Sequence, residues 1–149
     1  MKTVYFAQHA KATSKEIDEH RPLSADGTDE TRSVASCLKK HHVEINKVCH
    51  SGKLRAVQTA NIFAEILDVD DVIQLDVMNP NDEPTKLIQQ ISQDKVLYVG
   101  HLPNIQKVVS KLICDEDAAV VQFQNSAVVC IEVNGSESSI QWFMTPGMC

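Results

Sequence analysis

Strand-like and helix-like segments alternate along this chain, and that alternation limits the fold more than any other feature. Apolar runs rich in β-branched residues take turns with amphipathic runs of helical periodicity, a pattern typical of a parallel sheet covered by helices. The strands are expected at 3–7, 46–51, 72–75 and 95–100, and the helices within 23–42 and at 53–67, 85–92 and 102–114. Ser24 is the expected N-cap of the first helix.

The last part of the chain departs from the alternation. Three strand-like runs, at 119–123, 127–133 and 139–144, follow one another, and Asn134-Gly135 is a hairpin signal. The whole pattern predicts a three-layer α/β/α sandwich with a mostly parallel central sheet. At 149 residues, we expect a single domain over 1–149.

Composition excludes several functional classes. The net charge of -6 argues against sequence-independent binding of nucleic acid, which needs a basic surface. No run approaches the roughly 18 apolar residues of a membrane span, and the start of the chain has no signal-peptide pattern. The five cysteines are widely spaced and form no CxxC pair, which favours a reducing cytoplasm over a disulfide framework or a zinc ribbon. We therefore expect a cytoplasmic protein.

Polar side chains follow three of the predicted buried strands. Gln8 and His9 follow the first, Ser51 follows the second with Arg55 four residues later, and His101 follows Gly100 at the end of another. In open α/β sheets, ligands bind at the carboxyl ends of the strands, so these side chains are expected to converge.

A phosphoryl group is the ligand that such a cluster favours. Guanidinium groups bind phosphate oxygens in a fork, and charge-assisted bonds are about twice as strong as neutral ones. Arg55 supplies one guanidinium, and Arg21 on a nearby loop supplies a second. The expected helix N-termini after Ser51 and His101 add backbone N–H donors for an anion. A single histidine at a strand end is more typical of a structural role, but the combination favours function.

Four motifs in order give the chain a family resemblance. They are "YFAQHA" at 5–10, "RPLSADG" at 21–27, "SGKLRAVQTA" at 51–60 and "GHLPN" at 100–104. Together they resemble the histidine phosphatase superfamily, whose fold includes phosphoglycerate mutase, and within it the short SixA-type phosphohistidine phosphatases. The resemblance extends over nearly the whole chain and implies the phosphoglycerate mutase-like fold.

The resemblance also implies residue roles. His9 matches the nucleophile that takes the phosphoryl group, and His101 matches the second catalytic histidine. Arg55 matches the arginine that clamps the phosphate, and Arg21 matches the additional loop arginine of the SixA type. The implied reaction is a two-step transfer through phosphohistidine on His9, which water then hydrolyses.

Three further positions are assigned to phosphate binding: Gln8, Ser51 and Asn104. Gln8 is the departure from the family, which places an arginine directly before the nucleophile. A neutral amide still donates hydrogen bonds to phosphate but brings no charge. The difference is about 1 kcal/mol or somewhat more, so roughly tenfold in affinity or rate. Gln8 therefore predicts a weakened site and leaves open whether the chain turns over at all.

The loop 76–84 bears on the substrate. Larger relatives carry a lid insertion there, whereas this loop is short, so no lid insertion is predicted and an open site would accept a side chain on a protein surface. Asp82 and Glu83 are the candidates for the acid that protonates a phosphoester leaving group, although a turn explains them equally well. The imidazole of phosphohistidine, with a pKa near 6.5, needs little acid assistance.

Three functions remain open at this stage. The first is a phosphohistidine phosphatase acting on a histidine-phosphorylated protein, the second a phosphatase for small phosphoesters, and the third a phosphate-binding pseudoenzyme weakened by Gln8. A receiver-type signalling domain is set aside because His9 and Ser51 stand where its aspartates belong. No metal or cofactor is predicted, since no HExxH, DxDxDG or Walker pattern is present. No nucleic-acid or membrane partner is predicted either.

Overall fold

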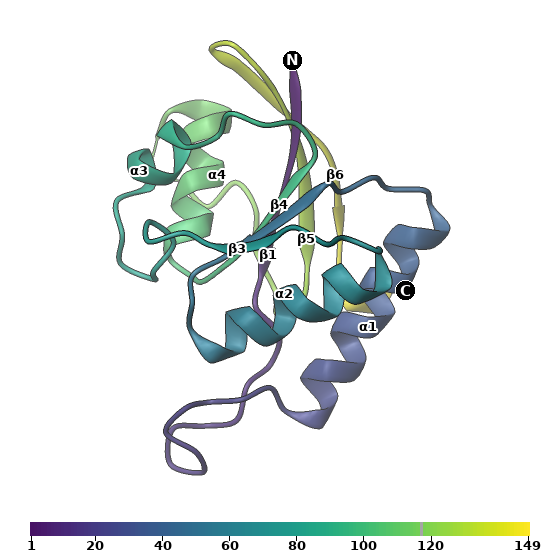
Figure 1. The fold of residues 1–149 in the computed structure, drawn as a ribbon. Helices are drawn as coiled ribbons and strands as arrows, with labels where there is room; N and C mark the ends of the chain where they lie inside the picture. Colours follow the sequence, from purple (N-terminus) through teal and green to yellow (C-terminus); the bar gives the residue numbers. More distant parts are fainter. Residues whose placement is uncertain (117) are drawn as a thin grey trace.

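A six-stranded mixed sheet with helices on both faces forms the centre of the molecule (Figure 1). The computed structural model describes residues 1–116 and 118–149. The strands are β1 Lys2–Gln8, β2 Lys47–His50, β3 Val72–Gln74, β4 Val96–Gly100, β5 Val128–Asn134 and β6 Glu137–Met144. The helices are α1 Ala25–Lys40, α2 Leu54–Ile66, α3 Pro84–Gln89 and α4 Asn104–Cys114, with the 3-10 turn η1 Pro146–Met148.

The sheet has the order β3-β2-β4-β1-β5-β6. The four strands β3, β2, β4 and β1 are mutually parallel, and β5 and β6 add an antiparallel hairpin next to β1. Helices α1 and α2 cover one face and α3 and α4 the other (Figure 1). The predicted three-layer architecture is confirmed.

Each face of the sheet has its own hydrophobic core. Tyr5 and Ala7 of β1 point to the α1/α2 face, where they pack with residues such as Leu38 and Phe63. Val4 and Phe6 point to the opposite face, toward α3 and α4. Side chains of a strand alternate between faces, so a strand buried on both faces is apolar throughout, as the run 3–7 is.

The parallel strands bring their carboxyl ends to one edge. Gln8 is the last residue of β1 and pairs with Gly100, the last residue of β4. The helix after β4, α4, packs closely against the end of this strand. A Cβ on Gly100 would lie only 2.6 Å from Cγ2 of Ile105, so only glycine fits there. His9 and His101 therefore leave the sheet side by side.

The motif at 21–27 holds α1 against the loop that follows His9. Ser24 caps α1 as predicted: its Oγ accepts the Gly27 amide at 3.0 Å. The Ser24 amide donates to the Lys11 carbonyl oxygen at 2.9 Å, and a Cβ on Gly27 would lie 2.1 Å from that same oxygen. Glycine is needed here because the helix and the loop approach too closely for a side chain.

The predicted strand 119–123 is wrong. Residues 118–124 form no strand, although Val121 and Phe123 are buried and their neighbours are exposed. Val121 and Phe123 pack into the core on the α3/α4 face of the sheet. The Val121 carbonyl accepts a hydrogen bond from the Gln106 side chain and not from a neighbouring strand. The edge next to β1 is occupied by β5, so this segment covers a face of the sheet instead of extending it.

The first helix packs one face into the core that it shares with α2. Its buried residues are Gly27, Thr31, Val34, Ala35 and Leu38, whereas His41 is the exposed C-cap. Between β3 and α3 the chain runs through a short loop, 75–83.

In the described part of the chain, no helix combines the length and the apolar character needed to cross a membrane.

Candidate active site

His9 lies directly after β1 with its ring almost fully buried. Its amide donates to the Gly100 carbonyl at 3.0 Å, which continues the pairing of β1 with β4 by one residue. Its Nδ1 lies 2.7 Å from the Ala10 carbonyl oxygen. A carbonyl oxygen only accepts, so Nδ1 carries the proton and the neutral ring has its lone pair on Nε2.

The pKa of His9 is lowered to about 4, chiefly by burial and also by the positive charges of Arg55 and Arg21, against an opposing effect of the Ala10 carbonyl. The ring is therefore neutral at pH 7. A neutral imidazole with a free Nε2 is the form that attacks phosphorus. A ring in this state can act as a nucleophile without a separate base.

His101 lies beside His9. The two ring centroids are 5.1 Å apart, with an angle of 50° between the ring planes. The Nε2 atom of His101 lies 2.6 Å from the Ser51 hydroxyl, which fixes the ring. The pKa of His101 is lowered to about 3, chiefly by burial; His9 when it is protonated, and the positive charges of Arg55, Lys53 and Arg21, act in the same direction.

Two guanidinium groups approach this histidine pair without carboxylate partners in the described residues. Arg55 is in the first turn of α2 and is half-buried; its Nε atom is buried with no hydrogen-bond partner among the described residues. Burial and the charge of Arg21 lower the pKa of Arg55. Arg21 has a left-handed backbone (φ 50°), and its Nε donates to the Thr13 carbonyl at 3.1 Å. Unpaired cations at one place form a site for an anion.

Comparisons with known proteins agree with this geometry. The chain is 28% identical to phosphohistidine phosphatase SixA of Escherichia coli (strain K12), over 96% of this chain and 93% of that protein. Its structure is similar to that of the protein histidine phosphatase SixA complexed with tungstate, with a TM-score of 0.83 and 27% identity over 98% of both chains. Over its full length, the chain is thus similar to the SixA type of the histidine phosphatase superfamily.

Other comparisons bear on the fold alone or give nothing. The alpha-ribazole phosphatase from Shigella flexneri is similar in structure, with a TM-score of 0.78, but only 13% identical over 97% of this chain and 96% of that one. No family model matches the sequence. The fold is thus that of the phosphoglycerate mutase-like hydrolases, as the four motifs predicted.

Gln8, the departure from the family pattern, ends β1 at the same edge. Its backbone carbonyl accepts the Ser126 amide at 3.0 Å, and its side chain is half-buried. Its Oε1 atom is buried and has no hydrogen-bond partner in the described part of the chain. No ion pair or hydrogen bond of the protein engages its amide nitrogen among those residues.

Asn104 is fully buried at the start of α4, and its Nδ2 donates to the Asp82 carbonyl at 2.9 Å. This bond ties α4 to the loop 75–83, so its contact with that loop is structural. The Oδ1 atom of Asn104 is buried without a partner among the described residues.

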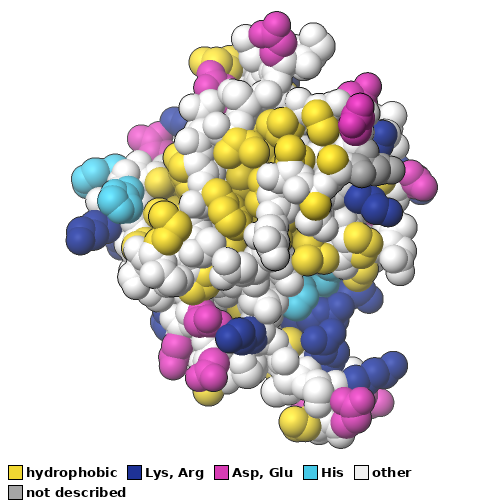
Figure 2. Space-filling model, turned by 180° about the vertical axis from the view of Figure 1, so that it is seen from behind, with side chains coloured by type: hydrophobic (Ala, Val, Ile, Leu, Met, Phe, Trp, Pro, Cys, Tyr) yellow, Lys and Arg dark blue, Asp and Glu magenta, His cyan; other side chains and the backbone are white. Residues whose placement is uncertain are grey.

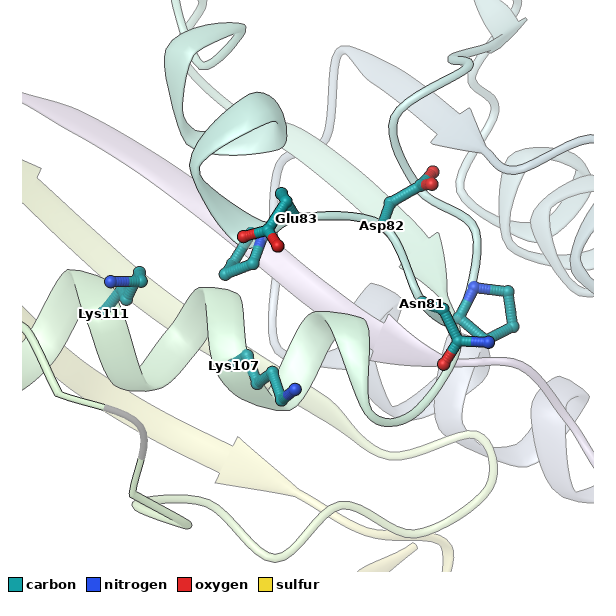
Figure 3. A pocket seen from close by; sticks show the side chains of 7 residues that line it. Asn81, Asp82, Glu83, Lys107 and Lys111 are labelled. Atoms are coloured by element: carbon teal, nitrogen blue, oxygen red, sulfur yellow. The ribbon is translucent and has the colours of Figure 1, made fainter.

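Asp82 and Glu83 point in different directions (Figure 3). The Asp82 carboxylate accepts the Asn79 amide at 2.8 Å and closes a turn. Glu83 is exposed and lines a surface pocket together with Lys107 and Lys111 of α4. No hydrogen bond joins either carboxylate to His9 within the described residues.

Sequence analysis did not single out two residues that hold the loop around His9. Thr59 accepts the Ala10 amide at 2.9 Å while its hydroxyl donates to the Arg55 carbonyl at 2.7 Å, so it joins the His9 loop to α2. Asn125 donates to the His9 carbonyl at 2.9 Å. Thr59 lies inside the motif at 51–60, so the sequence could have indicated it. Asn125 lies in a segment whose sequence pattern indicates only a turn.

Burial, together with the nearby positive charges, predicts that both site histidines stay neutral well below pH 7. His9 and His101 should remain neutral down to about pH 5. Arg55→Ala should raise both pKa values, because it removes a positive charge and admits water. NMR titration of the histidine ring signals measures the values directly.

Arg32→Ala is the matched control, since Arg32 is an exposed arginine on α1. It should leave both pKa values unchanged. An ordinary pKa for His9 in the unaltered protein, or equal titrations in the two variants, would contradict this description of the site.

Proposed function

We propose that this SixA-type protein is a phosphohistidine phosphatase that acts on a histidine-phosphorylated protein through a covalent intermediate on His9. The single observation that carries the proposal is the free, neutral Nε2 of His9 beside two unpaired guanidinium groups. That combination fits a nucleophile facing a phosphoryl group.

In the proposed reaction, Nε2 of His9 attacks phosphorus in line with the bond to the substrate imidazole. The phosphorus–nitrogen bond breaks, and its electron pair goes to the imidazole nitrogen. Water then attacks the phosphoryl group on His9, and the bond from phosphorus to Nε2 breaks with its electron pair returning to Nε2. The oxygen and both protons of the water leave with the released inorganic phosphate. The hydrogen bond from Nδ1 of His9 to the Ala10 carbonyl stabilises the positive charge that develops on the ring during attack.

The phosphoryl oxygens are held by the surrounding donors. Arg55 and Arg21 supply charge, and His101, held by Ser51, donates a ring N–H. Positioning and electrostatic stabilisation provide most of the catalysis of phosphoryl transfer, which explains the need for several donors. All the positive charge in this mechanism comes from the protein, and no step requires a metal.

Phosphohistidine is favoured over a phosphoester by the leaving group. An alkoxide leaving group needs a proton from a nearby acid, whereas imidazole leaves readily. The Asp82 carboxylate is engaged at a turn, and Glu83 is exposed beside the lysines of α4. Neither placement supports an acid aimed at a leaving group on His9. The short loop 75–83 leaves room for a protein surface.

The proposal predicts how turnover depends on His9 and Arg55. His9→Ala should abolish phosphate release, because no neighbouring group replaces the nucleophile. Arg55→Ala should lower the rate by a factor on the order of 10², since a charged contact to the transition state is lost. Phosphate release is measured side by side from a phosphohistidine protein and an aryl phosphate ester.

His41→Ala, which changes an exposed histidine at the end of α1, and Arg32→Ala serve as controls and should keep full activity. Turnover by His9→Ala would overturn the covalent mechanism. Faster release from the aryl ester than from the phosphoprotein would favour the phosphoester phosphatase instead.

Gln8 favours one alternative, a phosphate-binding protein with little or no turnover. Gln8→Arg should raise the affinity for inorganic phosphate or the turnover by roughly tenfold, because it gains a charge-assisted contact. The measurements are kcat/KM on a phosphohistidine protein and inhibition by inorganic phosphate. Gln90→Arg, on the exposed residue after α3, is the control for added charge.

The outcomes separate the alternatives. If neither quantity changes in Gln8→Arg, then Gln8 lies outside the phosphate site. If only Gln8→Arg turns over, the unaltered chain is a pseudoenzyme, and Gln8 is the residue at which catalysis was lost.

A further inference from the structure

Three exposed aliphatic residues lie close in the chain to residues of the candidate active site. Ile17 lies in the loop that leads to Arg21 and is 79% exposed. Leu54 directly precedes Arg55, and Leu102 directly follows His101; they are 39% and 36% exposed. Away from the two ends of the chain, the remaining exposed large aliphatic residues of the described part are Val120 and Ile140.

The loop that carries Ile17 is ordered by its own hydrogen bonds. The amides of Ile17 and Asp18 both donate to the Ser14 carbonyl, at 3.1 and 3.0 Å. The Arg21 amide donates to the Asp18 carbonyl at 3.1 Å, and the Arg21 side chain donates to the Thr13 carbonyl. The loop therefore presents Ile17 to solvent in a defined place, at no further cost in loop ordering.

The three residues belong to the same end of the molecule. Leu54 is the first residue of α2, and Leu102 lies between β4 and α4, so both follow strands whose carboxyl ends meet at His9. The loop that contains Ile17 projects beyond the start of α2 (Figure 1). Figure 2 shows Lys and Arg side chains gathered beside a histidine at this end.

Charge complements the apolar residues. The chain has a net charge of -6, yet Arg21, Lys53 and Arg55 all act on His101 as positive charges. A cationic centre within an aliphatic rim suits a phosphoryl group that stands on an apolar protein surface. A small phosphorylated molecule would reach the centre without covering side chains as far out as Ile17.

We propose that Ile17, Leu54 and Leu102 form an apolar rim that docks the folded protein surface around the phosphohistidine, and so select a phosphoprotein over small phosphorylated substrates. The inference rests on the proposed function and specifies the partner of the same site. Burying one such aliphatic side chain strengthens a complex by about tenfold. The rim therefore acts on binding of the protein substrate and not on the chemical step.

The test compares two substrates: a phosphorelay protein phosphorylated on its histidine with phosphoramidate, and free phosphohistidine. Ile17→Ser and Leu54→Ser should each raise KM for the phosphoprotein by about tenfold. Both should leave kcat/KM for free phosphohistidine within about twofold of the unaltered protein, because neither residue touches the phosphoryl group. Ile140→Ser, which alters an aliphatic residue on β6 that is as exposed as Leu54, is the control and should change neither value.

A second measurement does not depend on turnover. In a His9→Ala background, calorimetry gives Kd for the same phosphoprotein, and Ile17→Ser should weaken binding by the same factor. If the rim variants match Ile140→Ser in both KM and Kd, the rim does not dock the substrate, while the proposed function stands. Equal losses on both substrates would also overturn the rim. If the protein releases phosphate from neither substrate, the proposed function fails, and the calorimetric comparison alone decides the rim.

Discussion

The parallel pairing of β1 with β4 is the interaction on which the site depends. It sets Gln8 opposite Gly100, and the bond from the His9 amide to the Gly100 carbonyl extends it by one residue. Through this pairing the two histidines leave the sheet together, with ring centroids 5.1 Å apart. A register shift by one residue would turn His9 to the other face of the sheet and separate the pair. The apolar residues that bury β1 on both faces therefore also determine where His9 and His101 lie.

Burial and the nearby positive charges then set the protonation state of the two histidines. Both rings are neutral because they are buried near uncompensated cations, and the Ala10 carbonyl leaves the His9 lone pair on Nε2. The same cations that would oppose a charged histidine attract a phosphoryl group. Binding that anion would compensate the positive charge of the site. Arg55, which has no carboxylate partner among the described residues, thus lowers the stability of the free protein and favours the complex with an anion. Such a compromise is common at functional sites.

Much of this arrangement follows from the sequence, and the exceptions have physical reasons. The positions of His9 and His101 could be predicted because strand ends are visible in apolar runs, and parallel strands end at one edge. The strand predicted at 119–123 is absent because an alternation of apolar and polar residues shows only which side chains are buried. It does not show whether the backbone pairs with another strand. The contact of Asn125 with the His9 carbonyl joins residues 116 positions apart, and no local pattern carries such a contact.

The central claim is that His9 carries the phosphoryl group during turnover, and a trapping experiment tests it most directly. The protein is mixed briefly with a stoichiometric amount of phosphohistidine protein and quenched in alkali, where phosphohistidine survives, and its peptides are analysed by mass spectrometry. The account predicts one phosphoryl group, located on His9, that appears and decays as inorganic phosphate is released, and none in His9→Ala. Phosphate release at the full rate with no phosphorylated His9, or with the phosphoryl group on another residue, would contradict it.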